Sequence, residues 1–292
     1  MPENKLFCFG YGYTSSFFSF ALMKQGWSVA GTTRSAEKAE KIWSDGVEAI
    51  VWDGGAFDVS ALDGVNAVLI STPPNESGCP ALKAAGSALA ALAANITWLG
   101  YLSTNGVYGD HGGAWVDETS ALRPTTDRAR RRIKAENDWR AFAEAHDLPL
   151  IIFRLPGIYG PGRSALDTVR AGKAKRIYKE GQMFSRMHVE DIAAALEASL
   201  MNRPALDLYN LADDEPAPPQ DVIEYACGLL SVELPPLTPL ESADLSEMAK
   251  SFYTDNKRVS NQRMKNALAV TLKYATYRDG LKAIFEMEAS SR

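Results

Sequence analysis

The sequence has few cysteines, no excess of positive charge and no long apolar run, and each shortage excludes a class of protein. Its three cysteines, Cys8, Cys79 and Cys227, form no Cys-x-x-Cys pair, which indicates a reducing cytoplasmic environment and no structural metal. A net charge of −5 argues against general nucleic-acid binding, which needs a basic face. No run approaches the ~18 apolar residues of a membrane span. We expect no signal peptide, because an apolar strand begins almost at the N-terminus.

Short apolar runs alternate with segments of helical periodicity along most of the 292 residues, of which 46% are hydrophobic. Such runs suit buried parallel strands and are too short for helices. The alternation predicts an α/β fold, a Rossmann doubly wound parallel sheet with helices on both faces, and ligands at the carboxyl ends of the strands. Strands are expected at residues 6–9, 48–52, 67–70, 97–102 and 150–155, helices at 36–45, 81–94, 127–146 and 277–289, and a loop at 110–126.

A glycine turn separates the first expected strand from the first helix. The spacing Gly10-x-Gly12-x-x-Ser15 follows the dinucleotide fingerprint except at the third glycine, where close packing of helix on strand asks for a small residue. The unpaired N–H groups and partial positive charge of the helix start suit a pyrophosphate. We therefore assign Gly10, Gly12, Tyr13, Thr14 and Ser15 to a cofactor site. The alternative is an ordinary turn without a ligand.

The end of the second strand favours NADP over NAD. A free ribose 2′-hydroxyl is usually held by an acid about twenty residues after the glycines, whereas a 2′-phosphate is accommodated by an Arg. Here the chain reads Gly-Thr-Thr-Arg-Ser, with no acid before Glu37. Thr33, Arg34 and Ser35 offer hydroxyls and a charged fork for a phosphate. NADP is therefore the expected cofactor, and NAD is the alternative. Arg34 could also be an ordinary solvated side chain at a strand end.

Other strand ends and the proline clusters complete the expected layout. Because ligands lie at the carboxyl edge of such a sheet, the candidate contacts are Asp53, the segment Ser71, Thr72 and Pro73, and residues 103–105.

Beyond residue 160 the alternation weakens, and prolines cluster at 216–219 and 235–239, which indicates a smaller discontinuous C-terminal substrate lobe. We expect a cofactor domain of residues 1–160 plus about 187–212, and a substrate lobe of about 161–186 and 213–292.

Three motifs accompany the glycine turn. Residues 102–109 read Leu-Ser-Thr-Asn-Gly-Val-Tyr-Gly, residues 154–162 read Arg-Leu-Pro-Gly-Ile-Tyr-Gly-Pro-Gly, and residues 188–193 read His-Val-Glu-Asp-Ile-Ala. Over most of its length the sequence resembles the extended short-chain dehydrogenase/reductases of the NAD-dependent epimerase/dehydratase type. The resemblance implies a C-terminal lobe closing over a substrate, with the active site between lobe and Rossmann domain. It implies further that Thr104 matches the catalytic Ser/Thr, that Asp53 lies near the adenine, and that Pro156 and Ile158 lie near the nicotinamide.

The sequence departs from this family at its proton-transfer pair. Family members carry Tyr-x-x-x-Lys on the helix after the fifth strand, but the helix expected at 127–146 contains no tyrosine, and Arg128 and Arg132 align with the two positions. An Arg cannot act as acid or base at workable pH. The pattern resembles the atypical branch of the family. The two arginines either grip a phosphate or carboxylate from one helix face, or form a solvated basic face with Arg132 paired to Glu136.

Few other side chains are candidates for chemistry. Thr104 could hydrogen-bond a substrate carbonyl or hydroxyl, or only stabilise a turn. Tyr108 and Tyr159 lie in loops, but neither has a Lys four residues on. His188 precedes a helix and is interpreted as a packing or capping residue rather than a base. The histidines have no metal-ligand spacing, so no metal is expected.

These observations lead to two functional hypotheses. The first is an NADP-binding oxidoreductase or epimerase/dehydratase-like enzyme that acts on a small polar, sugar-like or anionic substrate by hydride transfer. The second is a non-catalytic NADPH-binding redox sensor or scaffold, which the missing tyrosine favours. The expected partners are a small-molecule substrate and, by analogy with the family, a second copy of the chain in a homodimer. Neither nucleic acid nor membrane is an expected partner.

Overall fold

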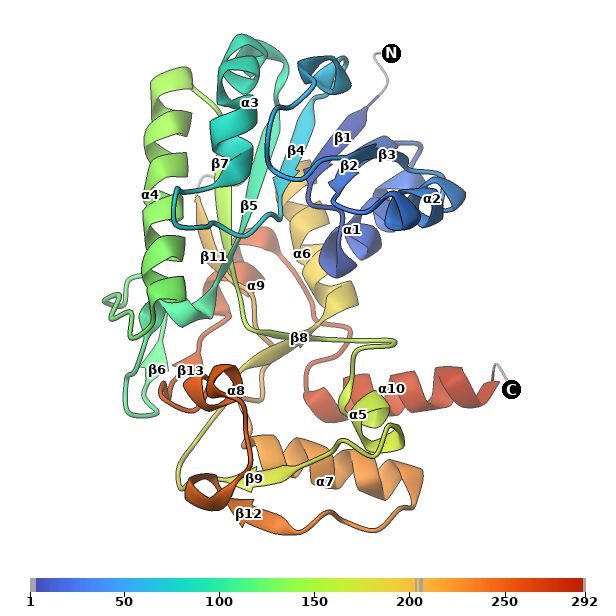
Figure 1. Ribbon diagram of the computed structural model, residues 1–292, viewed down its shortest axis with the longest axis vertical. Helices are drawn as coiled ribbons and strands as arrows, with labels where there is room; N and C mark the ends of the chain where they lie inside the picture. Colours follow the sequence, from blue (N-terminus) through green and yellow to red (C-terminus); the bar gives the residue numbers. More distant parts are fainter. Residues whose placement is uncertain (1–3, 203, 205–206, 291–292) are drawn as a thin grey trace. The chain divides into compact units, whose positions relative to one another are not determined.

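The computed structural model describes residues 4–202, 204 and 207–290, and these form two compact units (Figure 1). Unit 1 comprises the described residues within 1–104, 130–154 and 193–209. Unit 2 comprises those within 105–129, 155–192 and 210–292. Among the described residues, no helix is both long and apolar enough to cross a membrane.

The elements alternate as the sequence predicts. The strands are β1 (Lys5–Phe9), β2 (Ser28–Thr33), β3 (Glu48–Val51), β4 (Ala67–Ile70), β5 (Trp98–Thr104), β6 (Trp115–Val116), β7 (Leu150–Leu155), β8 (Gly157–Tyr159), β9 (Arg176–Tyr178), β10 (Arg186–His188), β11 (Leu208–Asn210), β12 (Leu237–Pro239) and β13 (Arg258–Val259). The helices are α1 (Tyr13–Met23), α2 (Ala36–Ser44), α3 (Pro80–Ala91), α4 (Asp127–His146), α5 (Ala165–Arg170), α6 (Val189–Asn202), α7 (Pro219–Leu230), α8 (Glu247–Ser251), α9 (Gln262–Leu268) and α10 (Tyr277–Ser290).

Unit 1 is built on a seven-stranded sheet with the order β11-β7-β5-β4-β1-β2-β3. Strand β1 pairs in parallel with β2 and with β4, and the pairs β2–β3 and β4–β5 are also parallel. The strand order reverses at β1 and β4, and such a switch point leaves a crevice at the carboxyl ends of the two strands. The predicted doubly wound α/β fold is therefore confirmed.

Helices cover both faces of this sheet (Figure 1). Helices α3 and α4 pack on one face, where Leu99 and Tyr101 of β5 join the core. On the other face, the ring of Phe18 of α1 lies 5.7 Å from that of Trp98, and Trp98 Nε1 donates to Ser199 Oγ of α6 over 3.1 Å. The side chains of β5 thus alternate between the faces, as a strand buried on both sides requires.

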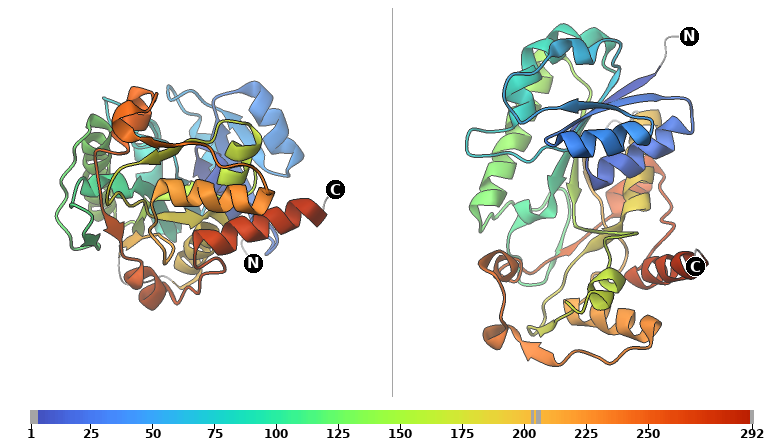
Figure 2. Two further views of the ribbon diagram at one scale, coloured as in Figure 1. Left: turned by 90° about the horizontal axis from the view of Figure 1, so that it is seen from below. Right: turned by 45° about the vertical axis from the view of Figure 1, so that its right-hand side comes forward.

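Unit 2 contains the paired strands β8–β10, β9–β12 and β6–β13, all parallel. Helices α5, α7 and α10 supply most of its apolar core, and the views in Figure 2 show α7 and α10 side by side. Strand β6 lies within the predicted loop at 110–126, and it forms because its two residues pair with Arg258 and Val259 far along the chain. That partner is invisible to a local sequence pattern.

Candidate cofactor site

The glycine turn after β1 is fixed between the ends of two neighbouring strands. Gly10 has φ +90°, and a Cβ there would lie 3.2 Å from Thr72 Cγ2 and from Thr72 N, so this position needs glycine. The N–H of Gly10 donates to Thr32 Oγ1 over 2.7 Å, and the N–H of Tyr11 donates to the Thr32 carbonyl over 2.7 Å. The turn therefore lies at the switch point of the sheet, anchored by a threonine that the sequence analysis did not single out.

Gly12 is the N-cap of α1 and leaves the helix without a side-chain cap. No side chain of Gly12 can cap the helix, no acidic residue lies in the first turn, and a Cβ at Gly12 would meet nothing within 4 Å. The first N–H groups of a helix lack intrahelical partners and carry a partial positive charge. This end of α1 can therefore receive an anion such as a pyrophosphate.

The next residues of α1 hold the turn in place. Ser15 is fully buried, and its hydroxyl donates to the Gly10 carbonyl over 3.0 Å. It thus provides the close packing that a third glycine would provide. Thr14 is also buried, and the Tyr13 ring packs 5.2 Å from that of Phe17. Direct contact of these three residues with a cofactor stays a prediction.

The end of β2 offers one exposed cation. The Thr33 side chain is buried, and the backbone carbonyl of Thr33 accepts from the N–H of Trp52 over 2.7 Å. Ser35 caps α2, since its hydroxyl accepts from the N–H of Lys38 over 3.3 Å. Arg34 is exposed between them, and Asp53, beyond β3, is exposed too. Arg34 is therefore the side chain at this strand end that can meet a phosphate.

The ends of β4 and β5 complete the carboxyl edge of the sheet in unit 1. The N–H of Ser71 donates to the Phe9 carbonyl over 2.8 Å, so the segment with Ser71, Thr72 and the exposed Pro73 lies beside the glycine turn. Thr104 is the half-buried last residue of β5. Pro156 and Ile158 belong to unit 2, where Ile158 pairs with Met187, and their expected place near a nicotinamide stays a prediction.

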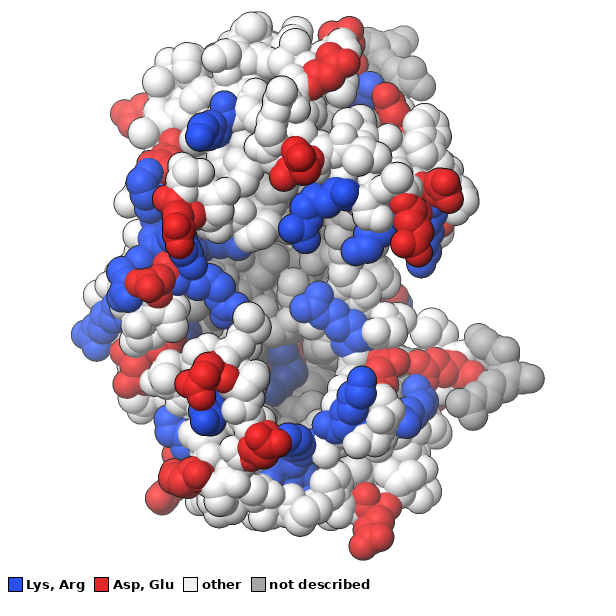
Figure 3. All heavy atoms as spheres, in the orientation of Figure 1, with Lys and Arg blue, Asp and Glu red and all other residues white. Residues whose placement is uncertain are grey.

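Arg132 is bound to strand β5, and its predicted grip on a phosphate or carboxylate stays a prediction. Its Nη1 donates to Tyr101 Oη and to the Leu102 carbonyl, each over 2.9 Å, so the guanidinium is bound to β5. The alternative that pairs Arg132 with Glu136 on a solvated face is wrong, because Glu136 is fully buried and accepts instead from Arg154 on β7. Arg128 is exposed, with its guanidinium 5.1 Å from the Phe252 ring centroid. Figure 3 shows basic side chains gathered over the start of α4.

The buried carboxylate of Glu136 organises the end of β5. Arg154 Nε lies 3.1 Å from Glu136 Oε1, and Arg154 Nη2 lies 2.8 Å from Oε2, a two-pronged ion pair. The hydroxyl of Ser103 donates to the same carboxylate. Since Ser103 directly precedes Thr104, this network holds the strand end on which Thr104 stands. No local sequence pattern reveals this network, because three distant segments supply its members.

The two candidate tyrosines are poor substitutes for the missing proton-transfer residue, and Tyr159 ends strand β8 instead of lying in a loop as expected. Tyr108 is fully buried, and its hydroxyl donates to Asn210 Oδ1 over 2.7 Å. The Tyr159 hydroxyl donates to the Thr276 carbonyl over 3.4 Å, and burial raises the pKa of Tyr159 above its usual value. Both hydroxyls have roles within unit 2, and a raised pKa disfavours the phenolate that a general base needs.

His188 is a packing residue with a consequence for acid stability. It is buried between the rings of Tyr159 and Tyr274, at centroid distances of 5.2 and 4.1 Å, and its Nδ1 accepts from the N–H of Glu190. Burial lowers the pKa of His188 to about 4, against the carboxylate of Glu190, while the ammonium of Lys273 lowers it further. The folded state therefore favours the neutral ring. As the pH falls from ~6.5 towards 4, the imidazole takes up a proton in the unfolded state but not in the folded state, so the free energy of unfolding decreases.

We expect His188→Asn, which keeps an acceptor for the Glu190 N–H, to reduce the acid sensitivity of the protein. Between pH 7 and 4.5 the variant should lose about 2 kcal/mol less free energy of unfolding than the parent. Urea titrations at both pH values measure this difference. Equal losses in the two proteins would contradict the neutral buried imidazole.

The doubly wound sheet with a glycine turn at its switch point shows that the protein has a Rossmann fold. The sequence model of the NAD dependent epimerase/dehydratase family matches residues 87–212. A functionally unknown conserved protein from Silicibacter pomeroyi DSS is 49% identical, with 98% of this chain and 99% of that chain covered and a TM-score of 0.90. The chain belongs to the NAD-dependent epimerase/dehydratase family, which confirms its resemblance to the extended short-chain dehydrogenase/reductases.

Two solved enzymes share the fold at low identity. UDP-glucuronic acid 4-epimerase from Bacillus cereus in complex with NAD is 17% identical, with 97% of this chain and 96% of that chain covered and a TM-score of 0.75. dTDP-glucose 4,6-dehydratase from Bacillus anthracis in complex with NAD is 18% identical, with 99% and 97% covered and a TM-score of 0.75. A comparison with curated proteins gave no significant match.

Proposed function

We propose that the protein binds NADP and acts as an oxidoreductase or epimerase/dehydratase-like enzyme on a small polar, sugar-like or anionic substrate, by hydride transfer. The observation that carries this proposal is the open N-terminus of α1 behind Gly12, at the switch point of the sheet. Family membership supports it, as do the two related folds, whose names state complexes with NAD and substrates that are sugar nucleotides.

The roles of the residues follow from their places at the strand ends. Gly10 and Gly12 let the backbone approach the pyrophosphate, and Arg34 meets the 2′-phosphate. The bound dinucleotide supplies the hydride donor or acceptor. Thr104 hydrogen-bonds a carbonyl or hydroxyl of the substrate. Because α4 contains no tyrosine, proton transfer needs a group other than the usual Tyr-x-x-x-Lys pair.

The same helix favours the second hypothesis, a non-catalytic NADPH-binding sensor or scaffold. Arg132, which aligns with the missing Lys, is bound to Tyr101 and Leu102 of β5. Incubation with NADP or NADPH and a panel of sugars, aldehydes and ketones separates the two functions through the nicotinamide absorbance. Turnover of any member supports the enzyme, whereas tight NADPH binding without turnover across the panel supports the sensor. The homodimer and the division into a cofactor domain and a substrate lobe stay predictions.

Arg34→Ala tests the choice of cofactor. Removing the guanidinium should weaken NADPH binding at least tenfold, about 1.4 kcal/mol, and leave NADH binding unchanged, because only NADPH carries the 2′-phosphate. Calorimetric titration of both nucleotides measures the change. Lys41→Ala is the matched control, since it removes an exposed positive charge from the neighbouring helix α2. Tighter NADH binding in the parent, or equal losses in the two variants, would refute the assignment of NADP.

A further inference from the structure

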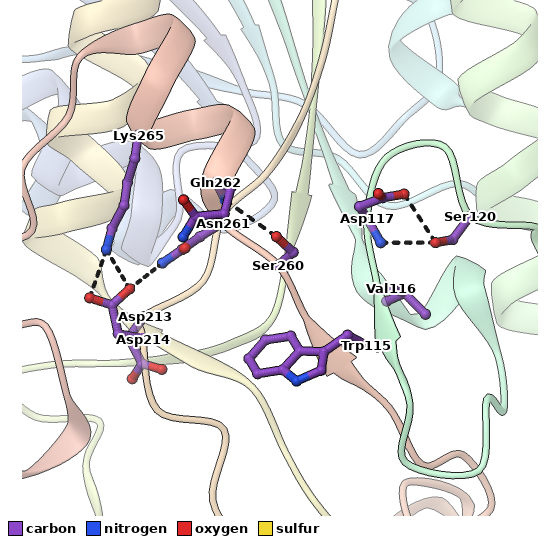
Figure 4. A pocket seen from close by; sticks show the side chains of 10 residues that line it. All are labelled: Trp115, Val116, Asp117, Ser120, Asp213, Asp214, Ser260, Asn261, Gln262 and Lys265. Atoms are coloured by element: carbon purple, nitrogen blue, oxygen red, sulfur yellow. Dashed lines mark hydrogen bonds and ion pairs between the residues drawn. The ribbon is translucent and has the colours of Figure 1, made fainter.

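Unit 2 contains a cavity of about 630 Å³ in which most polar side chains are bonded to one another (Figure 4). Lys265 Nζ lies 2.6 Å from Asp214 Oδ1, and the hydroxyl of Ser120 donates to Asp117 Oδ1 over 3.1 Å. Groups that are satisfied in this way select no class of ligand. The contacts that join the glycine turn to the end of β2 in unit 1 are more informative.

Thr32, the last residue but one of β2, accepts two hydrogen bonds from the glycine turn. Its Oγ1 accepts from the N–H of Gly10 and its backbone carbonyl accepts from the N–H of Tyr11, each over 2.7 Å. Only 2% of Thr32 is exposed, so water cannot easily replace either acceptor. Because a buried N–H without an acceptor is costly, these bonds fix the direction of the first two peptide groups of the turn.

The ring of Tyr11 makes a second contact with β2. A Cβ at Gly31 would lie 2.9 Å from Tyr11 Cδ2 and 3.1 Å from Tyr11 Cβ, so the tyrosine lies directly against the Gly31 backbone. Burial raises the pKa of Tyr11 to about 12, against the effect of a hydrogen bond with the Ser19 side chain on α1, so the phenol is neutral. We call the contacts of Gly31 and Thr32 with Gly10 and Tyr11 the β2 clamp.

The β2 clamp determines which backbone groups remain for a pyrophosphate. The N–H groups of Gly10 and Tyr11 are used by Thr32. The first N–H groups of α1, behind Gly12, lack intrahelical partners and carry the partial positive charge of the helix. A pyrophosphate is therefore expected at the start of the helix and not at the end of β1.

The same clamp sets the position of Arg34 relative to the turn. Arg34 follows Thr32 by two residues, and Thr33 between them is held from the other side, since its backbone carbonyl accepts from the N–H of Trp52. The exposed guanidinium thus starts from a backbone that is fixed to the turn and to β3. NADPH carries its pyrophosphate and its 2′-phosphate on one adenosine, so it fills both sites together only when their spacing matches that of the ligand.

We propose that Thr32 is a positioning residue for NADPH, which sets the spacing between the pyrophosphate site at the start of α1 and the 2′-phosphate site at Arg34. This role rests on the proposed binding of NADP. Thr32 acts through Gly10 and Tyr11 and not by contact with either phosphate, because its hydroxyl and carbonyl are buried against the turn. The preference for NADPH then depends on a buried hydroxyl as well as on an exposed cation.

Calorimetric titration of NADPH and NADH into Thr32→Val tests this role. Valine keeps the shape of the side chain and removes the acceptor of the Gly10 N–H. We expect NADPH binding to weaken at least tenfold and NADH binding by less than threefold, since NADH has no 2′-phosphate to misplace. Thr32→Ser keeps the hydroxyl and should bind NADPH within threefold of the parent. Thr97→Val is the matched control and should do the same, because it also removes a hydroxyl in unit 1, one that donates to the Asn66 carbonyl before β5 begins.

A double-mutant cycle separates positioning from a general loss of structure. In the parent, Arg34→Ala should weaken NADPH binding at least tenfold. In the Thr32→Val background the same change should weaken it by less than threefold, because a misplaced guanidinium no longer meets the 2′-phosphate. A merely structural role of Thr32 would leave the factor for Arg34→Ala unchanged.

Several results would overturn this role. These are unchanged NADPH binding in Thr32→Val, equal losses of NADPH and NADH, an undiminished effect of Arg34→Ala in that background, and a loss in Thr32→Ser as large as that in Thr32→Val. Should Thr32→Val fail to fold, Tyr11→Ala decides the question, since removal of the ring opens the clamp at Gly31 and must lower the ratio of NADPH to NADH affinity at least threefold.

Failure of the NADP assignment is seen separately, in the parent alone. A parent that binds NADH more tightly than NADPH refutes the choice of cofactor, and the role of Thr32 with it. A parent that prefers NADPH, combined with independent effects of Thr32→Val and Arg34→Ala, refutes only the role of Thr32.

Discussion

Gly109→Ala is expected to lower the free energy of unfolding by more than ~4 kcal/mol and to leave little folded protein. Gly109 has φ +68°, and a Cβ there would lie 1.6 Å from the carbonyl oxygen and 2.5 Å from the carbonyl carbon of Arg123. These are backbone atoms held in place by the hydrogen bond from the Arg123 N–H to the Tyr108 carbonyl, at 3.0 Å. No side-chain rotation can relieve the overlap, so the two segments must separate.

The matched control for this change is Gly112→Ala in the same loop. Gly112 has a similar φ of +60°, but a Cβ there would meet nothing within 4 Å. Only the strain of a left-handed Ala remains, about 1 kcal/mol. Soluble yield and urea unfolding followed by circular dichroism compare the two variants. Similar losses in both would show that backbone strain, and not the contact with Arg123, sets the requirement for glycine.

Sequence reasoning worked best where local interactions decide the structure. The predicted ranges 67–70, 127–146 and 150–155 agree with β4, α4 and β7 at both ends. Short apolar runs flanked by glycine and proline, and a long segment rich in the helix formers Ala, Arg, Glu and Lys between them, carry enough local information for this. The glycine turn was found in the same way, because its spacing follows directly from the backbone geometry at a strand-to-helix junction.

Sequence reasoning failed where a side chain chooses among partners from distant segments. One of the two alternatives paired Arg132 with Glu136, because they are four residues apart on one helix, which is the local rule. In the folded unit β7 brings Arg154 to Glu136, and β5 brings the Leu102 carbonyl to Arg132. Buried charges take the partners that best satisfy them, and these are known only once the strand order is known.

Glu136→Ala is expected to lower the free energy of unfolding by about 3 to 5 kcal/mol, the usual range when one member of a buried ion pair is removed. Glu136 is fully buried and Arg154 is 3% exposed, so the substitution removes a two-pronged carboxylate from a guanidinium that water hardly reaches. It also removes the acceptor of the Ser103 hydroxyl and a contact with Arg140 Nη1 at 3.6 Å. Urea unfolding of variant and parent at neutral pH measures the loss.

The control is Asp138 on the same helix α4, whose carboxylate forms an exposed ion pair with Lys134 Nζ at 2.6 Å. Asp138→Ala removes an acidic side chain of similar size from the same helix, yet it should lower stability by less than ~1 kcal/mol, because surface pairs contribute little. Glu136→Gln separates charge from shape, since it keeps an acceptor for Ser103 and removes the ionic attraction to Arg154. We expect it to fall between the two. If all three variants lose equal stability, burial of the Glu136 carboxylate is not what fastens β5 to α4, and the network beneath Thr104 has another basis.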